Sequence, residues 1–373
     1  MHYTQNNLRD LINQFVVYGD FMVGVPFGNG HVNDTYMLTF DQGGIRLNYM
    51  LQRINNNVFK DPVKVMENVD RVTAHILKKI RASHTETRKR TIRLLRTPDN
   101  KPYVFDKKGN CWRAYVFMER ARAYDVLETP EQAFHVAQAF GEFQQQLTDL
   151  EGPRLHDTIP DFHNTPKRID QLEEAIREDR MNRVKTVQKE IDFVLERKKN
   201  AAILCKLNQE GAIPERITHN DTKCNNILMD DLSGEGICVI DLDTVMPGLS
   251  LYDFGDMVRS GTNPAEEDEQ DLSQVYMRFD MYEALFRGFY ASASSFMTPA
   301  EKEYMAEAGK IITLEIGTRF LTDYLQGDIY FKTKRPAHNL DRCRTQFKLV
   351  ESIEEQMDAM KMKVKETAKE YKA

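Results

Sequence analysis

Apolar residues in the first third of the chain recur in short runs, and polar turns separate these runs. The expected strands cover residues 21–27, 34–40, 45–54, 102–106 and 111–118. Asp41-Gln42-Gly43-Gly44 and Lys107-Lys108-Gly109-Asn110 each connect two of these strands and are typical of tight hairpin turns. The pattern therefore predicts an antiparallel sheet, followed within the same region by a helix that begins at Asp61-Pro62.

Beyond residue 118 the spacing of apolar residues changes to that of helices. Thr129-Pro130-Glu131-Gln132 is a capping box with proline at the first helical position, and Thr298-Pro299-Ala300-Glu301 is a second one. A stretch at 215–245 is strand-like. We therefore predict an α+β protein with a small β-rich lobe over 1–118 and a larger, mostly helical lobe over 119–373. A ligand is expected between the two lobes.

Composition and charge exclude several classes of protein. The 373 residues carry a formal net charge of −6, which argues against binding nucleic acid through bulk electrostatics. The sequence has no run of about 18 apolar residues that could span a membrane, and its first residues lack the apolar core of a secretory signal. Five widely spaced cysteines without a CxxC pair fit reduced thiols. We expect a cytoplasmic, monomeric enzyme that acts on small molecules.

One segment has the residue spacing that phosphoryl transfer requires. His219, Asp221, Lys223 and Asn226 form an H-x-D-x-K-x-x-N pattern, and Asp241 follows it after an apolar run. Asp221 is the candidate base that accepts the proton of the attacking hydroxyl, and Lys223 can stabilise charge on the transferred group. Asn226 and Asp241 offer hard oxygen ligands for a metal ion that bridges the phosphates. His219 is expected to support the loop backbone and not to react.

Several stretches resemble the aminoglycoside phosphotransferase and choline kinase superfamily. They are HNDTKCNNIL (219–228), VIDLDTVMPG (239–248), LYDFGD (251–256), FGNGHVNDTY (27–36) and GTRFLTDYLQGDIYF (317–331). Within the superfamily the resemblance is strongest to N-acetylhexosamine 1-kinases. It implies a protein-kinase-like fold, ATP as co-substrate and Mg²⁺ as cofactor. It also implies transfer to the anomeric hydroxyl of N-acetylglucosamine or N-acetylgalactosamine, which gives the sugar 1-phosphate.

Two further aspartates follow Asp241. Asp243 either binds a second metal ion or supports the metal site without touching the ion. Asp253 begins an Asp-Phe-Gly triplet that could be mistaken for the metal-binding motif of kinases, although order and spacing give that role to Asp241. In the resembled family a carboxylate at this position braces the catalytic loop, so we predict a structural role for Asp253.

The nucleotide is expected to contact a glycine loop, a strand and the connection between the lobes. Glycines at 28–33 let main-chain N–H groups approach phosphates. The strand at 45–54 lacks the usual phosphate-anchoring lysine; alternation puts Gln52 and Arg53 on opposite faces, and only Arg53 can supply charge. The adenine ring would bind main-chain groups near residues 118–120. The predicted nucleotide-binding residues are Gly28, Gly30, Asn33, Arg53, Met118 and Arg120.

The helix expected at 311–325 carries three charged residues among mostly apolar ones. Glu315, Arg319 and Asp323 recur at four-residue spacing and so share one stripe of the helix. They could form a charge ladder at the protein surface, or they could face the hydroxyl groups of a sugar. We predict the second arrangement.

The resemblance adds sugar contacts at Tyr330 and His31 to the one at Arg319, with the O1 hydroxyl beside Asp221. Two other functions are compatible with the motif. A kinase for choline, ethanolamine, an aminoglycoside or another sugar would use the same chemistry, but a cationic alcohol needs an acidic or aromatic cage, and Arg319 argues against one. A nucleotide-binding pseudokinase that serves as an interaction module is disfavoured because the catalytic motif is intact.

Overall fold

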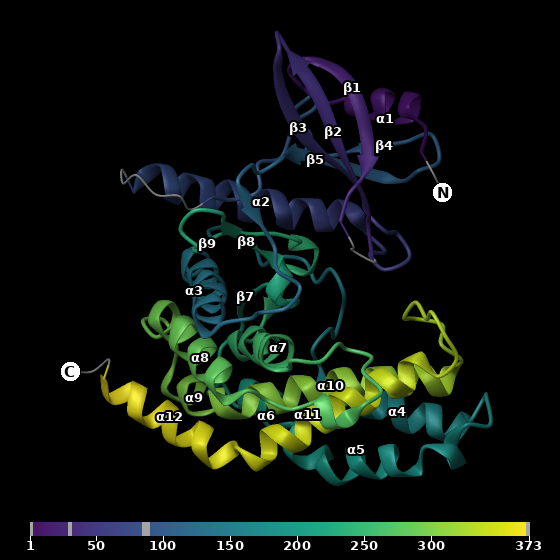
Figure 1. Ribbon diagram of the computed structural model, residues 1–373, viewed down its shortest axis with the longest axis vertical. Coiled ribbons are helices and arrows are strands. Elements are labelled where there is room, and N and C mark those ends of the chain that lie inside the picture. The colour runs from purple at the N-terminus through teal and green to yellow at the C-terminus, as the bar shows by residue number, and fades with distance from the viewer. Residues whose placement is uncertain (1–2, 29–31, 84–89, 371–373) are drawn as a thin grey trace.

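The computed structural model describes residues 3–28, 32–83 and 90–370 and has the expected two-lobed α+β architecture (Figure 1). The smaller lobe holds a five-stranded antiparallel sheet with the strand order β1-β2-β3-β5-β4. Its elements are α1 (Gln5–Ile12), β1 (Asp20–Pro26), β2 (Asp34–Gln42), β3 (Ile45–Arg53), β4 (Val104–Phe105) and β5 (Cys111–Val116). Every strand predicted for this lobe is present, although the one expected at 102–106 is shortened.

The sheet has a hydrophobic core of its own, closed on one side by α1. The β2–β3 hairpin turns through Gly43 and Gly44, whose φ angles of +60° and +89° are accessible to glycine without steric strain. Burial on one face fixes the register of the strands and so decides which side chains point toward the second lobe. The largest fully buried side chains of this core are Trp112, Phe40, Leu8, Ile12, Leu38 and Leu51.

The larger lobe is mostly helical, as the apolar spacing predicts. Both predicted capping boxes are confirmed, at Thr129 and at Thr298. Its helices are α3 (Pro130–Gln146), α4 (Thr165–Glu178), α5 (Gln188–Ala201), α6 (Ile203–Gln209), α7 (Ser250–Thr262), α8 (Phe279–Ala293), α9 (Pro299–Glu303), α10 (Met305–Gln326), α11 (His338–Glu355) and α12 (Met357–Glu370).

Short strands in the larger lobe lie next to the small lobe (Figure 1). They are β6 (Ala121–Arg122), β7 (Arg216–Thr218), β8 (Ile227–Asp230), β9 (Gly236–Val239) and β10 (Met246–Gly248). Ile227 of β8 pairs with Val239 of β9, so the residues just before β8 lie beside those just after β9. Strand β10 pairs with β7 and lies beyond the strand-like stretch that the sequence indicates.

Helix α2 (Pro62–Ala82) belongs to the small lobe by sequence but packs into the main core of the large one. Val65, Val69 and Val72 are buried in the core that also contains side chains of α3 and α8. The buried Asn68 adds polar links, because its Nδ2 donates to the carbonyls of His156 (2.8 Å) and Val245 (2.9 Å). The helix is therefore fixed to the large lobe, while the sheet keeps a separate core.

A third apolar core lies at the far end of the large lobe. It joins α4, α5 and α11 to the C-terminal half of α10, with Ile169, Val194, Leu321 and Phe347 among its buried members. Helix α10 thus contributes to two cores and spans the lobe. Within the described ranges, no helix combines the length and the apolar character needed to cross a membrane.

Candidate active site

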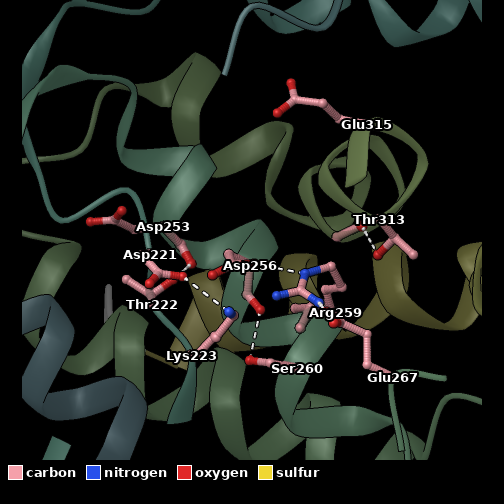
Figure 2. Close-up of polar contacts among 12 residues, drawn as sticks. Asp221, Thr222, Lys223, Asp253, Asp256, Arg259, Ser260, Glu267, Thr313 and Glu315 are labelled. Carbon is pink, nitrogen blue, oxygen red and sulfur yellow. Dashed lines mark hydrogen bonds and ion pairs between the residues drawn. The ribbon is translucent and has the colours of Figure 1, made fainter. Parts of the chain in front are cut away.

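The loop between β7 and β8 carries Asp221, and Asp253 on α7 holds this loop in place (Figure 2). The main-chain N–H groups of His219 and Asn220 donate to the two oxygens of the Asp253 carboxylate, at 2.9 and 2.7 Å. Gln144 donates to the same carboxylate at 2.6 Å, and the Thr222 hydroxyl donates to the Asp253 carbonyl. Burial raises the pKa of this carboxyl group, and the donors oppose the rise. The predicted structural role of Asp253 is confirmed.

The residue before the candidate base has an unusual backbone conformation. Asn220 has a φ of +64°, a region that asparagine tolerates better than most residues. Its side-chain amide donates to the carbonyls of Thr218 (3.2 Å) and Thr244 (3.0 Å), which stabilises the turn. A Cβ at Gly248 would lie only 2.7 Å from Asn220 Oδ1, so glycine is required opposite this turn. The loop geometry is therefore determined from several sides.

Asp221 has the immediate partners that a base at this position requires. Lys223 Nζ lies 3.8 Å from its Oδ1 (Figure 2). Asn226 Nδ2 donates to the main-chain carbonyl of Asp221 at 2.8 Å. Burial would raise the pKa of Asp221, but Lys223 and the buried Arg259 help to hold it below the ordinary value. The Asp221 carboxylate in turn raises the pKa of Lys223. Both groups are therefore charged at neutral pH, the base as carboxylate and the lysine as cation.

His219 supports the loop backbone, as predicted. Its Nε2 lies 2.9 Å from the Ile240 carbonyl, and its Nδ1 accepts from the Asp221 N–H at 3.2 Å. The ring is fully buried and does not reach the surface on which Asp221 opens. It therefore connects the catalytic loop to the strand that precedes Asp241.

Asp241 differs from the other acidic groups of the site because its carboxylate has no hydrogen-bond or ion-pair partner in the part of the chain that is described. It follows β9 with a φ of +55°. Water reaches the side chain, yet protein surrounds it closely, and burial together with Asp243 and Asp221 raises its pKa to about 6. A carboxylate raised in this way is stabilised by a bound cation.

Asn226 can complete a metal site with Asp241. The Ile240 N–H donates to the Asn226 carbonyl at 2.9 Å, which brings the two residues together. The Asn226 side-chain nitrogen is used by Asp221, so its amide oxygen remains available for a ligand. Across the described ranges, no cluster of three or more His, Cys, Asp or Glu side chains gathers as a metal site. Two protein oxygens fit Mg²⁺, which takes its other ligands from phosphates and water.

Of the two roles expected for Asp243, the structure contradicts metal binding. This side chain is buried, and both of its oxygens have protein partners. Its Oδ1 forms a close ion pair with Arg113, and its Oδ2 accepts from Asn33 Nδ2 at 2.7 Å. Asn33, predicted to contact the nucleotide, is occupied too, because its Oδ1 accepts from the Asn55 N–H. Asp243 and Asn33 therefore connect the two lobes and leave no free oxygen for a metal ion.

Arg53 does not take the place of the missing lysine. It lies on the face of β3 opposite Gln52 and binds Asp34 through two nitrogens, at 2.5 and 2.8 Å. Gln52 instead accepts from Arg113, its neighbour on β5, at 2.6 and 2.9 Å. The positive charge on this side of the sheet thus comes from Arg113, which the sequence analysis missed. An arginine inside the apolar strand Cys111–Val116 was the available signal.

The remaining nucleotide-binding predictions lie in two places. Gly28 lies two residues beyond β1 with a φ of +79°, and a Cβ there would meet no atom within 4 Å; Gly30 and His31 lie outside the described residues. In the connection between the lobes, neither main-chain group of Met118 has a partner within the described chain. Arg120 has a φ of +59°, and its carbonyl accepts from Asp231. Main-chain groups at Met118 are thus available to a ligand.

Two predicted sugar contacts on α10 have other partners. Glu315 is completely buried and accepts from His163 Nδ1 (2.8 Å) and from the Thr165 hydroxyl (2.6 Å). Asp323 is buried and accepts from the main-chain N–H groups of residues 329–331 and from Asn339. The expectation that both acids face the sugar substrate is therefore wrong. Their carboxylates are buried and are already satisfied by donors of the protein.

Arg319 is the member of the stripe that lacks a polar partner. Its guanidinium lies among the rings of Phe162 (5.1 Å), Phe331 (5.6 Å) and Tyr330 (5.8 Å). No hydrogen bond or ion pair to Arg319 occurs within the described chain. Tyr330 is 56% exposed. Burial and the charge of Arg319 lower the pKa of the neighbouring Arg168. The end of α10 is therefore cationic and aromatic.

Comparison with known proteins agrees with this geometry. The profile of the phosphotransferase enzyme family matches residues 24–285, which include the sheet and the catalytic loop. An aminoglycoside phosphotransferase from Alicyclobacillus acidocaldarius has 14% identity and a TM-score of 0.64 over 96% of both chains. A spectinomycin phosphotransferase in complex with ADP and spectinomycin has 12% identity and a TM-score of 0.59, over 96% of this chain and 99% of that one.

An ethanolamine kinase from Plasmodium vivax has 14% identity and a TM-score of 0.53, over 87% of this chain and 82% of its own. At such low identities these likenesses establish the fold alone. The family profile carries more weight, because it spans most of the chain and contains Asp221, Asn226 and Asp241. On that match, the chain belongs to the phosphotransferase enzyme family.

Proposed function

We propose that the protein is a magnesium-dependent kinase that transfers the γ-phosphoryl group of ATP to the anomeric hydroxyl of an N-acetylhexosamine. The arrangement of Asp221 beside Asp241 supports this proposal most directly. One carboxylate is ionised and aimed by its loop, and the other has no protein partner. These are the environments that a base and a metal ligand need, respectively.

In this mechanism Asp221 accepts the proton of the O1 hydroxyl as that oxygen attacks the γ-phosphorus. The bond between O1 and the sugar carbon stays intact, so the product is the sugar 1-phosphate. Lys223 stands 3.8 Å from the base and can stabilise negative charge as the phosphoryl group moves. Asn226 and Asp241 would hold Mg²⁺, which supplies charge neutralisation and orientation of the phosphates.

The nucleotide is proposed to be ATP, with its adenine ring at Met118 and its phosphates under the loop that begins at Gly28. The ADP bound to the similar spectinomycin phosphotransferase supports this choice. Met118 offers unpartnered main-chain groups, which suit the edge of an adenine ring. Arg53 has no part in this arrangement, because Asp34 already neutralises it.

The acceptor is proposed to lie at Arg319 and Tyr330. An arginine without a carboxylate partner can donate to the hydroxyl and acetyl oxygens of a sugar, and an exposed ring can cover an apolar face of the sugar. A cationic alcohol such as choline or ethanolamine would meet Arg319 and, beside it, Arg168. Like charges at this distance disfavour that class of substrate, so the sugar is the better candidate.

The position of transfer is tested with N-acetylglucosamine and its methyl glycoside. The glycoside keeps every ring substituent but lacks the free O1 hydroxyl. We expect ADP release with the free sugar and none above background with the glycoside, which can still act as a weak competitor. Rapid turnover of the glycoside would overturn the anomeric assignment and leave a kinase for another hydroxyl. No turnover with N-acetylglucosamine, N-acetylgalactosamine or other hexoses would overturn the sugar assignment.

A further inference from the structure

His163, in the turn before α4, lies between two hydrogen-bond acceptors. Its Nδ1 is 2.8 Å from Glu315 Oε1, and its Nε2 is 2.9 Å from the main-chain carbonyl of Asn220. A carbonyl oxygen can only accept. Glu315 accepts at its other oxygen from the Thr165 hydroxyl at 2.6 Å, as an ionised carboxylate does. With Glu315 ionised, both ring nitrogens need a proton to satisfy these contacts, and a ring with two protons is an imidazolium cation.

A second buried histidine provides the contrast. His219 donates to the Ile240 carbonyl with one nitrogen and accepts the Asp221 N–H with the other. One donor and one acceptor require the neutral ring with its proton on Nε2. The two histidines contact opposite ends of the peptide group between Asn220 and Asp221, yet their partners require different protonation states.

We propose that His163 is a charged positioning residue for the catalytic base, held as an imidazolium by Glu315 and bonded to the peptide group that joins Asn220 to Asp221. The inference rests on the proposed role of Asp221. Asp253 fixes the preceding peptide group through the Asn220 N–H, at 2.7 Å. In the peptide group between Asn220 and Asp221, His163 fixes the carbonyl at 2.9 Å, and His219 Nδ1 accepts from the Asp221 N–H at 3.2 Å. With both main-chain groups bound, the peptide group cannot rotate, and the side chain of Asp221 keeps its direction.

The surroundings of His163 favour the charged ring. Glu315 faces it from α10, Tyr252 and Asp256 face it from α7, and Asp221 lies beyond Asn220 in the loop. Burial opposes the charge, but Glu315, the Asn220 carbonyl and Asp256 together offset this effect and raise the pKa of His163 above its ordinary value. The same contact lowers the pKa of Glu315, against the effect of its own burial. The proton accordingly resides on the imidazole and not on the carboxylate.

Nitrogen NMR of the full-length protein tests the protonation state without reference to any substrate. In ¹⁵N-labelled wild-type protein we expect both ring nitrogens of His163 to be protonated at pH 7, and one ring nitrogen of His219. Glu315→Gln removes the counter-charge, and its amide can donate to Nδ1, so His163 should then show one protonated nitrogen. An unprotonated His163 nitrogen in the wild type at pH 7 would contradict the charged state of His163, whichever alcohol the enzyme phosphorylates.

A matched pair of substitutions tests the positioning role. The amide nitrogen of glutamine reaches the position of histidine Nε2, whereas that of asparagine reaches only the position of Nδ1. His163→Gln therefore keeps the bond to Asn220, and His163→Asn keeps the bond to Glu315. Both variants are neutral and leave Glu315 without its counter-charge, so their unfolding temperatures should be similar.

With whichever alcohol the wild type phosphorylates, kcat of His163→Asn should fall roughly tenfold below that of His163→Gln, because a small displacement of the base is costly. The KM for the acceptor should differ little between the two. Equal kcat values for the pair would overturn the positioning role. Absence of sugar turnover in the wild type would remove the sugar assignment and leave the comparison of the pair intact.

Discussion

Asp241 and Asp253 lie within one short stretch of sequence, and the structure surrounds them in opposite ways. Asp253 is completely buried, and three donors fill its carboxylate oxygens. Asp241 is reached by water and has no partner among the described residues. The Asp-Phe-Gly triplet suggests Asp253 as the metal ligand, which is the wrong residue. The hydrogen-bond donors around each carboxylate, and not the triplet, determine its role. A carboxylate filled by protein donors supports the fold, and one left without donors can bind a cation.

The largest expected effect is on activity at Asp241. Asp241→Asn removes a metal-ligand charge, and turnover should fall by about 10²-fold or more because charge on the phosphates is no longer neutralised. The unfolding temperature at pH 8 should stay the same or rise, because repulsion from Asp243 and Asp221 is relieved. Steady-state kinetics and thermal unfolding measure the two effects. A destabilised variant with normal turnover would contradict the role given to Asp241.

Asp253→Asn should show the opposite profile. An amide cannot accept all the donors that the carboxylate accepts, so buried N–H groups lose their partners, and the free energy of unfolding should fall by about 2–3 kcal/mol. Denaturant unfolding measures this loss, with Asp241→Asn as the matched control. Equal stability of the two variants would remove the distinction between the two aspartates.

Arg319 extends the comparison to positive charges. Arg113 is neutralised by Asp243, whereas Arg319 lies among aromatic rings and has no carboxylate partner within the described chain. Arg319→Ala should raise the KM for the sugar by roughly tenfold, because about one charged hydrogen bond to the sugar is lost. The KM for ATP should not change. Arg319→Lys keeps the charge and should recover part of the loss. A silent Arg319→Ala variant would mean that the guanidinium only packs against the rings.

The smallest effect is a pH dependence. The folded-state pKa of Asp241, about 6, lies above the ordinary 3.8, so its contribution to stability is present below pH 4 and lost as pH rises through 6. A bound cation reverses that loss. Magnesium added to the ADP complex should therefore raise the unfolding temperature more at pH 8 than at pH 5. The difference should vanish in Asp241→Asn; its persistence there would assign the effect to another group.

The sequence predicts the fold and the catalytic loop well because their signals are local. Each predicted strand, each capping box and the H-x-D-x-K-x-x-N pattern is contained within a short stretch of sequence. Turn residues and the spacing of apolar residues are also local features of the sequence. The family match agrees with the same segments. The bracing role of Asp253 follows from the resemblance to the superfamily, whereas order and spacing give the metal role to Asp241.

The errors share a different cause. Asp243, Glu315 and Asp323 are acids whose roles depend on partners distant in sequence, such as Arg113 for Asp243 and His163 for Glu315. Spacing along a helix or strand shows which residues share a stripe, but not which donors lie opposite that stripe. Charge alone favours Arg53 over Gln52 as the residue that binds phosphate. Arg53 instead pairs with Asp34 on the neighbouring strand, and this pairing depends on the register of the two strands.

The attachment of α2 to the large lobe has a consequence for control of the enzyme. In a kinase whose corresponding helix can swing outward, displacement of that helix switches activity off. Here Asn68 and the apolar face of α2 lock the helix against the large lobe, so outward rotation would break buried hydrogen bonds and expose core. The sheet is joined to the large lobe by fewer buried contacts, chiefly the Arg113–Asp243 ion pair and the Asn33–Asp243 hydrogen bond. The packing of the large lobe therefore sets the position of α2, and moving this helix would cost buried contacts.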